Sequence, residues 1–187
     1  MPEESKSKLL PGEYVVLGGD APDQKRASFR LRGDALDPDA ITRATGLTPH
    51  QAHRKGDLRP SSDRRSEAGR REFPPWRSGL WSLHSESALP RTDNHLEDHL
   101  NWLLDRLAPA ADAIKQLCVD GDLTADFFCG YFMHQSNSGF EFSTRTLARI
   151  AALGATLGVD IYGPNPDDED RVKVVEADFR RAAVAPP

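Results

Sequence analysis

The sequence predicts an α+β fold in which an antiparallel or mixed sheet carries about three helices packed on one face. Two observations predict it. Short stretches of alternating apolar and polar residues, typical of half-buried strands, are interspersed with stretches that place apolar residues at helical spacing. Turn and capping residues mark the boundaries between them. The resulting order is strand, helix, loop, strand, helix, strand, strand, helix, strand, which is ferredoxin-like in spirit.

The 187 residues suffice for one domain with tails. Hydrophobic residues make up 38% and charged residues 28%, so a sizeable part of the chain is expected to be solvated loop or tail. We expect a flexible N-terminal extension at 1–26, a single α+β domain at 27–163 and an acidic C-terminal tail at 164–187. A flexible, arginine-rich insertion is expected at 58–77.

The first strand and the first helix follow one another closely. Apolar and polar residues alternate over 28–32, which predicts a strand with one buried face. Asp37 is a good N-cap for the helix that follows, and Pro38 suits its first position. Gly46 stands where a left-handed C-cap belongs. This helix therefore has two to three turns.

A second strand and the longest helix come next. Strand character returns at 79–85, and apolar residues recur at helical spacing over 95–118. Asn94 with Glu97 three residues later fits a capping-box-like start. Pro109 lies in the middle of this helix and removes one backbone donor, so it should kink the helix or divide it in two.

An aromatic strand is predicted at 126–134, and a turn then leads to 140–142 as its hairpin partner. Of the two cysteines, Cys118 lies at the end of the long helix and Cys129 lies inside the aromatic strand. Free cysteine is a small and usually buried hydrophobe, so both are expected in the core.

The last predicted helix begins at a Ser143 or Thr144 cap and is closed by Gly158. A short strand at 159–162 follows it. These elements complete the α+β domain.

Charge limits the classes of partner. The formal net charge of -5 argues against nonspecific binding of nucleic acid, which needs a basic face. Residues 53–77 carry a local charge of +4, and Phe73, Trp76 and the nearby Trp81 are available for stacking. Interleaved acidic residues weaken the positive field, so a solvated insertion is favoured. No secretory signal and no membrane span are recognisable, which predicts a soluble cytoplasmic protein with no membrane partner.

Histidines form the first candidate site. His95 and His99 are four residues apart on a predicted helix, so they share a side and could share a metal. His53, Asp57 and His84 could complete the ligands. The segment HLEDH lacks the HExxH pattern, however, because leucine takes the place of the base. The alternative is a plain surface pair.

Two further patterns carry candidate chemistry. In HRKGD, at 53–57, three cationic or titratable side chains precede Gly-Asp and could bind a phosphate or carboxylate; the alternative is a turn entering a strand. Ser82, His84 and Glu86 supply the residue types of nucleophilic catalysis, but the sequence offers no nucleophile elbow and no recognisable oxyanion donors.

Several blocks together resemble a known bacterial family. They are Ser28-Phe29-Arg30 with Gly33-Asp34, Leu36-Asp37-Pro38 with Gly46-Leu47, His53 to Asp57, Trp81-Ser82-Leu83, His99-Leu100 with Trp102-Leu103, Gly139 to Ser143, and Asp160-Ile161-Tyr162. In this order they are similar to the domain-of-unknown-function family numbered 4279, over about 27–163. The resemblance implies a small cytosolic α+β domain and attaches no catalytic mechanism to it.

The sequence thus favours a non-catalytic binding module for a protein partner or small ligand, with no cofactor. A bacterial immunity-type inhibitor of a toxin is a special case of it. The alternative is a metal-assisted enzyme built on His53, Asp57, His84, His95 and His99. The residues expected to contact the ligand or partner are His53, Arg54, Lys55, Asp57, Trp81 and Ser82.

Overall fold

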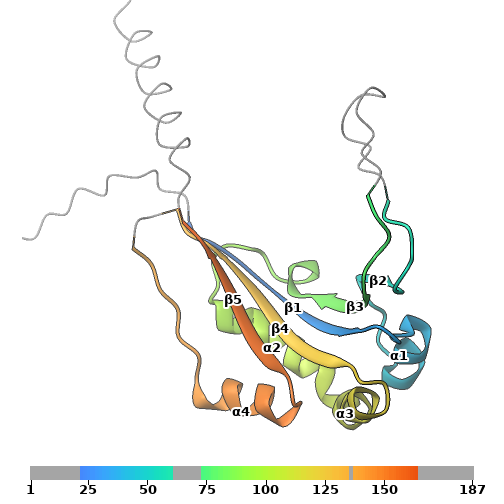
Figure 1. The fold of residues 1–187 in the computed structure, drawn as a ribbon. Coiled ribbons are helices and arrows are strands. Elements are labelled where there is room, and N and C mark those ends of the chain that lie inside the picture. The colour runs from blue at the N-terminus through green and yellow to red at the C-terminus, as the bar shows by residue number, and fades with distance from the viewer. Residues whose placement is uncertain (1–21, 61–72, 135–136, 164–187) are drawn as a thin grey trace, which may run out of the picture. The chain divides into compact units, whose positions relative to one another are not determined.

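Five strands form one mixed sheet in the order β2-β3-β1-β4-β5 (Figure 1). The computed structural model describes residues 22–60, 73–134 and 137–163. Residues 1–21 of the expected N-terminal extension, most of the arginine-rich insertion and the acidic tail lie outside these ranges, whereas residues 24–26 of that extension belong to the first strand. The strands are β1 (Gln24–Gly33), β2 (Gln51–His53), β3 (Gly79–His84), β4 (Thr124–Phe132) and β5 (Thr156–Tyr162). The helices are α1 (Pro38–Thr45), α2 (Leu96–Leu107), α3 (Ala111–Asp120) and α4 (Thr144–Ala152), with 3-10 turns η2 (Ser85–Ser87) and η3 (Ala108–Ala110).

Strand β1 lies at the centre of the sheet. It runs antiparallel to both neighbours, so that Phe29 is opposite Leu83 on β3 and Phe127 on β4. At one edge β2 pairs antiparallel with β3. At the other edge β5 runs parallel to β4, with Leu157 beside Phe127. The sheet is therefore mixed, which is one of the two arrangements that the sequence predicts.

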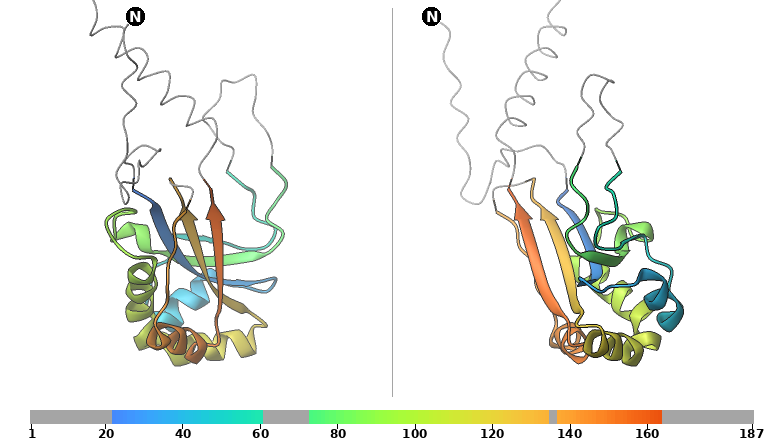
Figure 2. Two further views of the ribbon diagram at one scale, coloured as in Figure 1. Left: turned by 90° about the vertical axis from the view of Figure 1, so that its left-hand side faces the viewer. Right: turned by 45° about the vertical axis from the view of Figure 1, so that its right-hand side comes forward.

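The helices pack on one face of this sheet (Figure 2). Alternate residues of the central strands point into that layer, among them Phe29, Leu31 and Trp81, and all three are fully buried. They meet apolar side chains of the long helical segment, including Leu100 and Ile114. Because α2, η3 and α3 form one interrupted segment, three helical segments cover the face, which confirms the predicted α+β class.

Local signals located several boundaries correctly. Asp37 is extended and its carboxylate accepts a hydrogen bond from the Asp39 amide at 3.1 Å, while Gly46 ends α1 in the left-handed conformation at φ 69°. Pro109 lies in η3, where the long helix is divided in two. Ser143 caps α4 through a hydrogen bond from the Thr146 amide.

Other boundaries differ from the prediction. Residues 140–142 form no strand, because the edge of β4 is occupied by β5 in parallel, and a parallel neighbour requires a crossover rather than a hairpin. Gly154, at φ 69°, follows the end of α4, whereas Gly158 lies inside β5. The start of α2 is capped one residue later than predicted, at His95, whose amide donates to the Asp98 carboxylate at 2.8 Å.

Among the described residues, no helix covers the second face of the sheet, which we call the open face. Its side chains alternate with the core residues and include Arg26, Ser28, Arg30 and Arg32 of β1. Residues 54–60 and 73–78, which we call the arm, run side by side beyond β2 and β3. The Gly56 amide donates to the Trp76 carbonyl at 2.8 Å, and the Trp76 amide donates to the Asp57 carbonyl at 2.9 Å.

Candidate functional site

The open face and the arm enclose a groove of about 460 Å³, which we call the sheet groove. Strands β1 to β4 form its floor and the arm forms one wall. Five arginines line it, against one acidic residue, Glu86. The arginines are Arg26, Arg30 and Arg32 on β1 and Arg59 and Arg77 on the arm. This is a basic concavity on a chain whose net charge is -5.

Aromatic rings hold three of these guanidinium groups. Arg30 lies over Phe128 at 4.2 Å from the ring centroid, and Arg26 lies over Phe132 at 5.1 Å. A Cβ at Gly130 would come within 3.1 Å of the Arg26 Nε, so the glycine leaves the space in which Arg26 lies across β4. Stacking of this kind orients a planar guanidinium and leaves its edge free to donate hydrogen bonds.

The third stacked arginine belongs to the arm. Arg59 lies 4.2 Å from the centroid of Trp76, and the ring of His53 stacks on the same indole at 3.8 Å with an interplanar angle of 13°. Two groups this close to one ring centroid must take its two faces. The Arg59 Nε is buried and has no hydrogen-bond partner among the described residues. The arm therefore presents the Arg59 guanidinium in a fixed position, and neither face of the Trp76 ring beneath it is free to stack on a ligand.

Asp126 lies between two of these arginines on the open face, outside the groove lining itself. Its Oδ1 accepts from the Arg30 Nε at 2.7 Å and lies 2.6 Å from the Arg30 Nη2. Its Oδ2 lies 2.9 Å from the Arg32 Nη2, an ion pair without hydrogen-bond geometry. Within the described ranges, Arg26, Arg59 and Arg77 have no carboxylate partner.

The serine and histidine of β3 contact each other but form no catalytic triad. The Ser82 Oγ lies 3.0 Å from the His84 Nε2, and Ser82 is 1% exposed. Glu86 receives a hydrogen bond from Arg91 at 3.0 Å and is no partner of His84 within the described part of the chain. Burial lowers the pKa of His84, and the neighbouring His50 acts in the same direction. At neutral pH this imidazole is uncharged.

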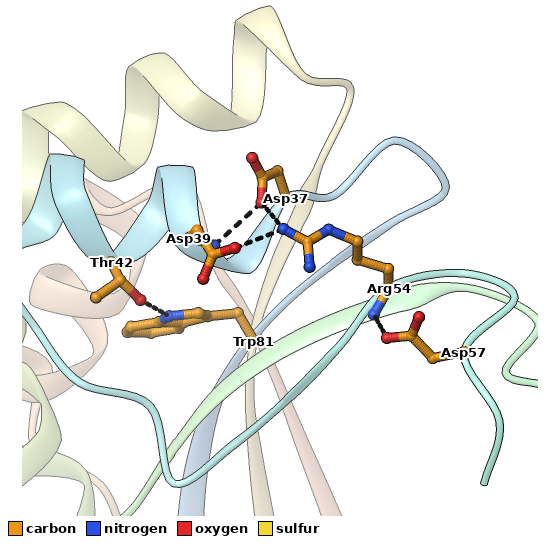
Figure 3. Close-up of polar contacts among 6 residues, drawn as sticks. All are labelled: Asp37, Asp39, Thr42, Arg54, Asp57 and Trp81. Atoms are coloured by element: carbon orange, nitrogen blue, oxygen red, sulfur yellow. Dashed lines mark hydrogen bonds and ion pairs between the residues drawn. The ribbon is translucent and has the colours of Figure 1, made fainter.

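The HRKGD segment is held by intramolecular contacts (Figure 3). The Arg54 Nη2 lies 2.5 Å from Asp37 and 2.6 Å from Asp39, at the N-terminus of α1. The Asp57 carboxylate accepts from the Arg54 amide at 2.6 Å, and Gly56 makes the turn at φ 89°. These bonds fix the start of the arm against α1.

The other expected contact residues lie in three different places. Lys55 pairs with Asp34 at 2.5 Å, beside the Arg54 contacts. Trp81 points into the helix layer, where it is fully buried and its Nε1 donates to Thr42 at 3.1 Å. His53 and Ser82 line the sheet groove. Burial lowers the pKa of His53, and Arg59 adds to this effect while Asp57 opposes it.

The histidines of the metal hypothesis do not come together. His99 is fully buried, with its Nδ1 2.8 Å from the Ser85 Oγ and its Nε2 2.9 Å from the Asn94 Oδ1. His95 caps α2 and lines a second hollow of about 430 Å³ beside Asp23. Within residues 22–60, 73–134 and 137–163, no three His, Cys, Asp or Glu side chains are placed to hold a metal ion.

Sequence reasoning missed the arginines of β1 as site residues. Arg30 and Arg32 alternate with buried residues, a pattern that equally describes an ordinary solvated strand face. The signal that could have singled them out is the concentration of arginine opposite aromatic residues, since Phe128 and Phe132 also alternate with core positions. Only the strand register places these residues side by side.

Together these features define an α+β domain with a mixed five-stranded sheet and one arginine-lined face that its helices leave open. The chain belongs to the family described as "Domain of unknown function (DUF4279)", whose family model matches residues 23–164. No curated protein and no solved structure has detectable similarity to it. In the described part of the chain, no helix combines the length and apolar character that a membrane span requires.

Proposed function

We propose that this protein is a non-catalytic binding module that takes a small ligand, or a segment of a protein partner, in the sheet groove. The observation that carries the proposal is the groove itself, in which stacking and ion pairs already hold the polar side chains in place. Pre-organised side chains lose little conformational entropy on binding, which favours affinity. The volume of about 460 Å³ is within the range of small-molecule sites.

The residues expected from the sequence have distinct parts in this proposal. His53 and Ser82 belong to the groove lining. Arg54, Lys55 and Asp57 act as positioning residues, because their contacts tie the arm to the segment around α1. Trp81 holds α1 against the sheet from the opposite face.

The burial and the partners of Ser82 and His84 in the groove favour binding without catalysis. Ser82 is buried, and among the described residues no carboxylate orients His84. A nucleophile needs access to its substrate and a base held by a third group. The Ser82–His84 pair is therefore better suited to fixing the groove floor.

A ligand screen tests the proposal. We would screen metabolite-sized compounds by ligand-observed NMR and map each hit on the isotope-labelled protein. Ser28→Tyr places a ring on the groove floor, whereas Thr156→Tyr places the same ring on the open face of β5, outside the groove lining. Hits should shift groove resonances and be lost only in S28Y. Hits that map to the hollow beside Asp23, or that are turned over by the protein, would refute the proposal.

A further inference from the structure

We infer that the sheet groove binds a small ligand carrying two or more carboxylate or phosphate groups, an inference that rests on the proposed function. The first argument is the type of side chain. A guanidinium donates two parallel hydrogen bonds to a carboxylate or phosphate, and it does so best when its plane is held in advance. Arg26, Arg30 and Arg59 are held in this way by Phe132, Phe128 and Trp76.

The second argument is that the rings themselves are not available to a ligand. His53 and Arg59 cover the two faces of Trp76, and Arg30 covers Phe128. Nucleobases and other flat aromatic ligands bind chiefly by stacking on exposed rings. The groove therefore offers hydrogen-bond donors at guanidinium edges rather than stacking surfaces, which selects oxyanions over aromatic groups.

The third argument is the balance of charge. Arg30 and Arg32 share the Asp126 carboxylate, whereas Arg26, Arg59 and Arg77 have no acidic partner among the described residues. Glu86, the acidic residue of the groove lining, is paired with Arg91, so these three cations repel one another without an ion-pair partner of their own. An anion bound between them removes that repulsion.

The fourth argument concerns the number of anionic groups. Arg26 and Arg30 are four residues apart on β1, which separates their backbones by about 13 Å along the strand. Arg59 and Arg77 approach the same groove from the arm. One carboxylate or phosphate group cannot reach all of these guanidinium groups, so a ligand that satisfies them carries at least two.

Isothermal titration calorimetry with pyrophosphate and with citrate tests this inference. At least one of the two should bind wild-type protein at a single site with a Kd below about 1 mM. If only pyrophosphate binds, the anionic groups of the ligand are phosphates. If only citrate binds, they are carboxylates. Failure of both anions while neutral hits from the screen still occupy the groove would overturn the inference and leave the proposed function intact.

Charge-matched variants locate the site. Arg26→Gln and Arg59→Gln should each weaken anion binding about tenfold or more, because each removes a charged hydrogen-bond donor. Arg145→Gln removes the same charge from the exposed surface of α4 and should change the Kd less than about twofold. Equal losses in all three variants would show that only net charge matters and would overturn the inference. Unfolding in urea verifies that each variant is folded.

Two further comparisons separate geometry from charge. Arg59→Lys keeps the cation but loses the planar fork, so it should bind nearly as weakly as R59Q. Gly130→Ala would place a Cβ 3.0 Å from the Phe132 ring and 3.1 Å from the Arg26 Nε, so it should shift this stacked pair without changing any charge and weaken binding. Gly158→Ala, on the same face, meets nothing within 4 Å and should not. If G130A and G158A bind the anion equally well, the inference is wrong. It is also wrong if an oligonucleotide or a poly-glutamate peptide binds in the groove about a hundredfold more tightly than either small anion.

Discussion

Asp126 gives the sharpest test of how the groove is built, because its removal should lower stability and raise anion affinity at the same time. Its side chain is 7% exposed, and its two oxygens serve Arg30 and Arg32. Asp126→Asn keeps an oxygen that can accept from Arg30, but it turns a charged pair into a charged–neutral bond and removes the ion pair with Arg32.

The size of the stability loss follows from exposure. Breaking a fully buried ion pair by removing one partner costs about 3–5 kcal/mol. Here the Arg32 side chain is 48% exposed and regains water, so that pair contributes less than about 1 kcal/mol. Weakening the hydrogen bond to Arg30 lowers the free energy of unfolding by about 1 kcal/mol more, which is part of what a charged hydrogen bond contributes. We therefore expect D126N to lower the free energy of unfolding by about 1–2 kcal/mol.

Anion affinity should change in the opposite direction. Removing one negative charge roughly 7 Å from a bound anion gains about 0.6 kcal/mol per ligand charge in a solvent-like medium, near threefold in Kd. Urea unfolding measures the first effect and calorimetry with pyrophosphate or citrate the second. Asp105→Asn, which removes an exposed carboxylate paired with Arg149 in the helix layer, serves as the control and should alter neither quantity appreciably. If D126N is folded but binds no more tightly than wild type, Arg30 and Arg32 do not face the ligand.

Three other predictions concern the fold around the site. Gly79→Ala should lower the free energy of unfolding by about 1–3 kcal/mol in a urea titration, because its Cβ would lie 2.7 Å from the Leu36 Cβ and 2.9 Å from the Gly33 carbonyl oxygen. The control, Gly158→Ala, should change the free energy of unfolding by less than about 0.5 kcal/mol. Equal effects would contradict the packing argument. Trp81→Phe and Thr42→Val should each lower the free energy of unfolding by about 1–3 kcal/mol. The double variant should lose less than the sum of the two single losses, because both substitutions remove the same hydrogen bond. Strict additivity would contradict a hydrogen bond between the two side chains. Burial lowers the pKa of His53, His84 and His99 in the folded protein, so the unfolded chain takes up more protons than the folded chain below the ordinary histidine pKa of about 6.5. The free energy of unfolding should therefore fall as the pH drops from about 7 to 5, and this pH dependence should be weaker in a His53→Gln, His84→Gln double variant. A flat profile would show that these histidines are solvated.

The sequence predicted those parts of the fold that depend on neighbouring residues. The caps of α1 and the break at Pro109 were predictable because capping bonds and the missing proline donor act within one turn of helix. Strand β2 was not predictable in this way. Gln51, Ala52 and His53 show no apolar alternation, and they form a strand only because they pair with β3.

The parallel pairing of β5 with β4 has the same non-local origin. Residues 140–142 have the alternation expected of a hairpin strand, and nothing in their own sequence reveals that a segment beyond α4 takes the edge of β4. Strand register of this kind depends on which pairing buries the most apolar surface in the whole domain. Local pattern therefore predicted the elements better than their partners.

The candidate site shows the same division. The HRKGD segment stands out in the sequence because its charges are adjacent, yet Arg54 and Lys55 turn to carboxylates of the segment around α1. The groove arginines are separated along the chain by residues that face the core, and Arg59 and Arg77 come from opposite sides of the arm. Adjacent charges tend to find partners nearby, whereas a binding surface on a sheet is assembled from alternate residues of several strands.

The placement of charge also bears on which anions can reach the groove. Five arginines face one acidic residue within the groove, although the whole chain carries a net charge of -5. A basic concavity attracts anions at short range, while the net negative charge of the whole chain opposes the approach of a long polyanion. A small anion that fits inside the groove feels mainly the arginines, but a nucleic acid strand extends onto the surface outside it. The same distribution of charge that disfavours nucleic acid therefore favours a compact ligand with a few carboxylate or phosphate groups.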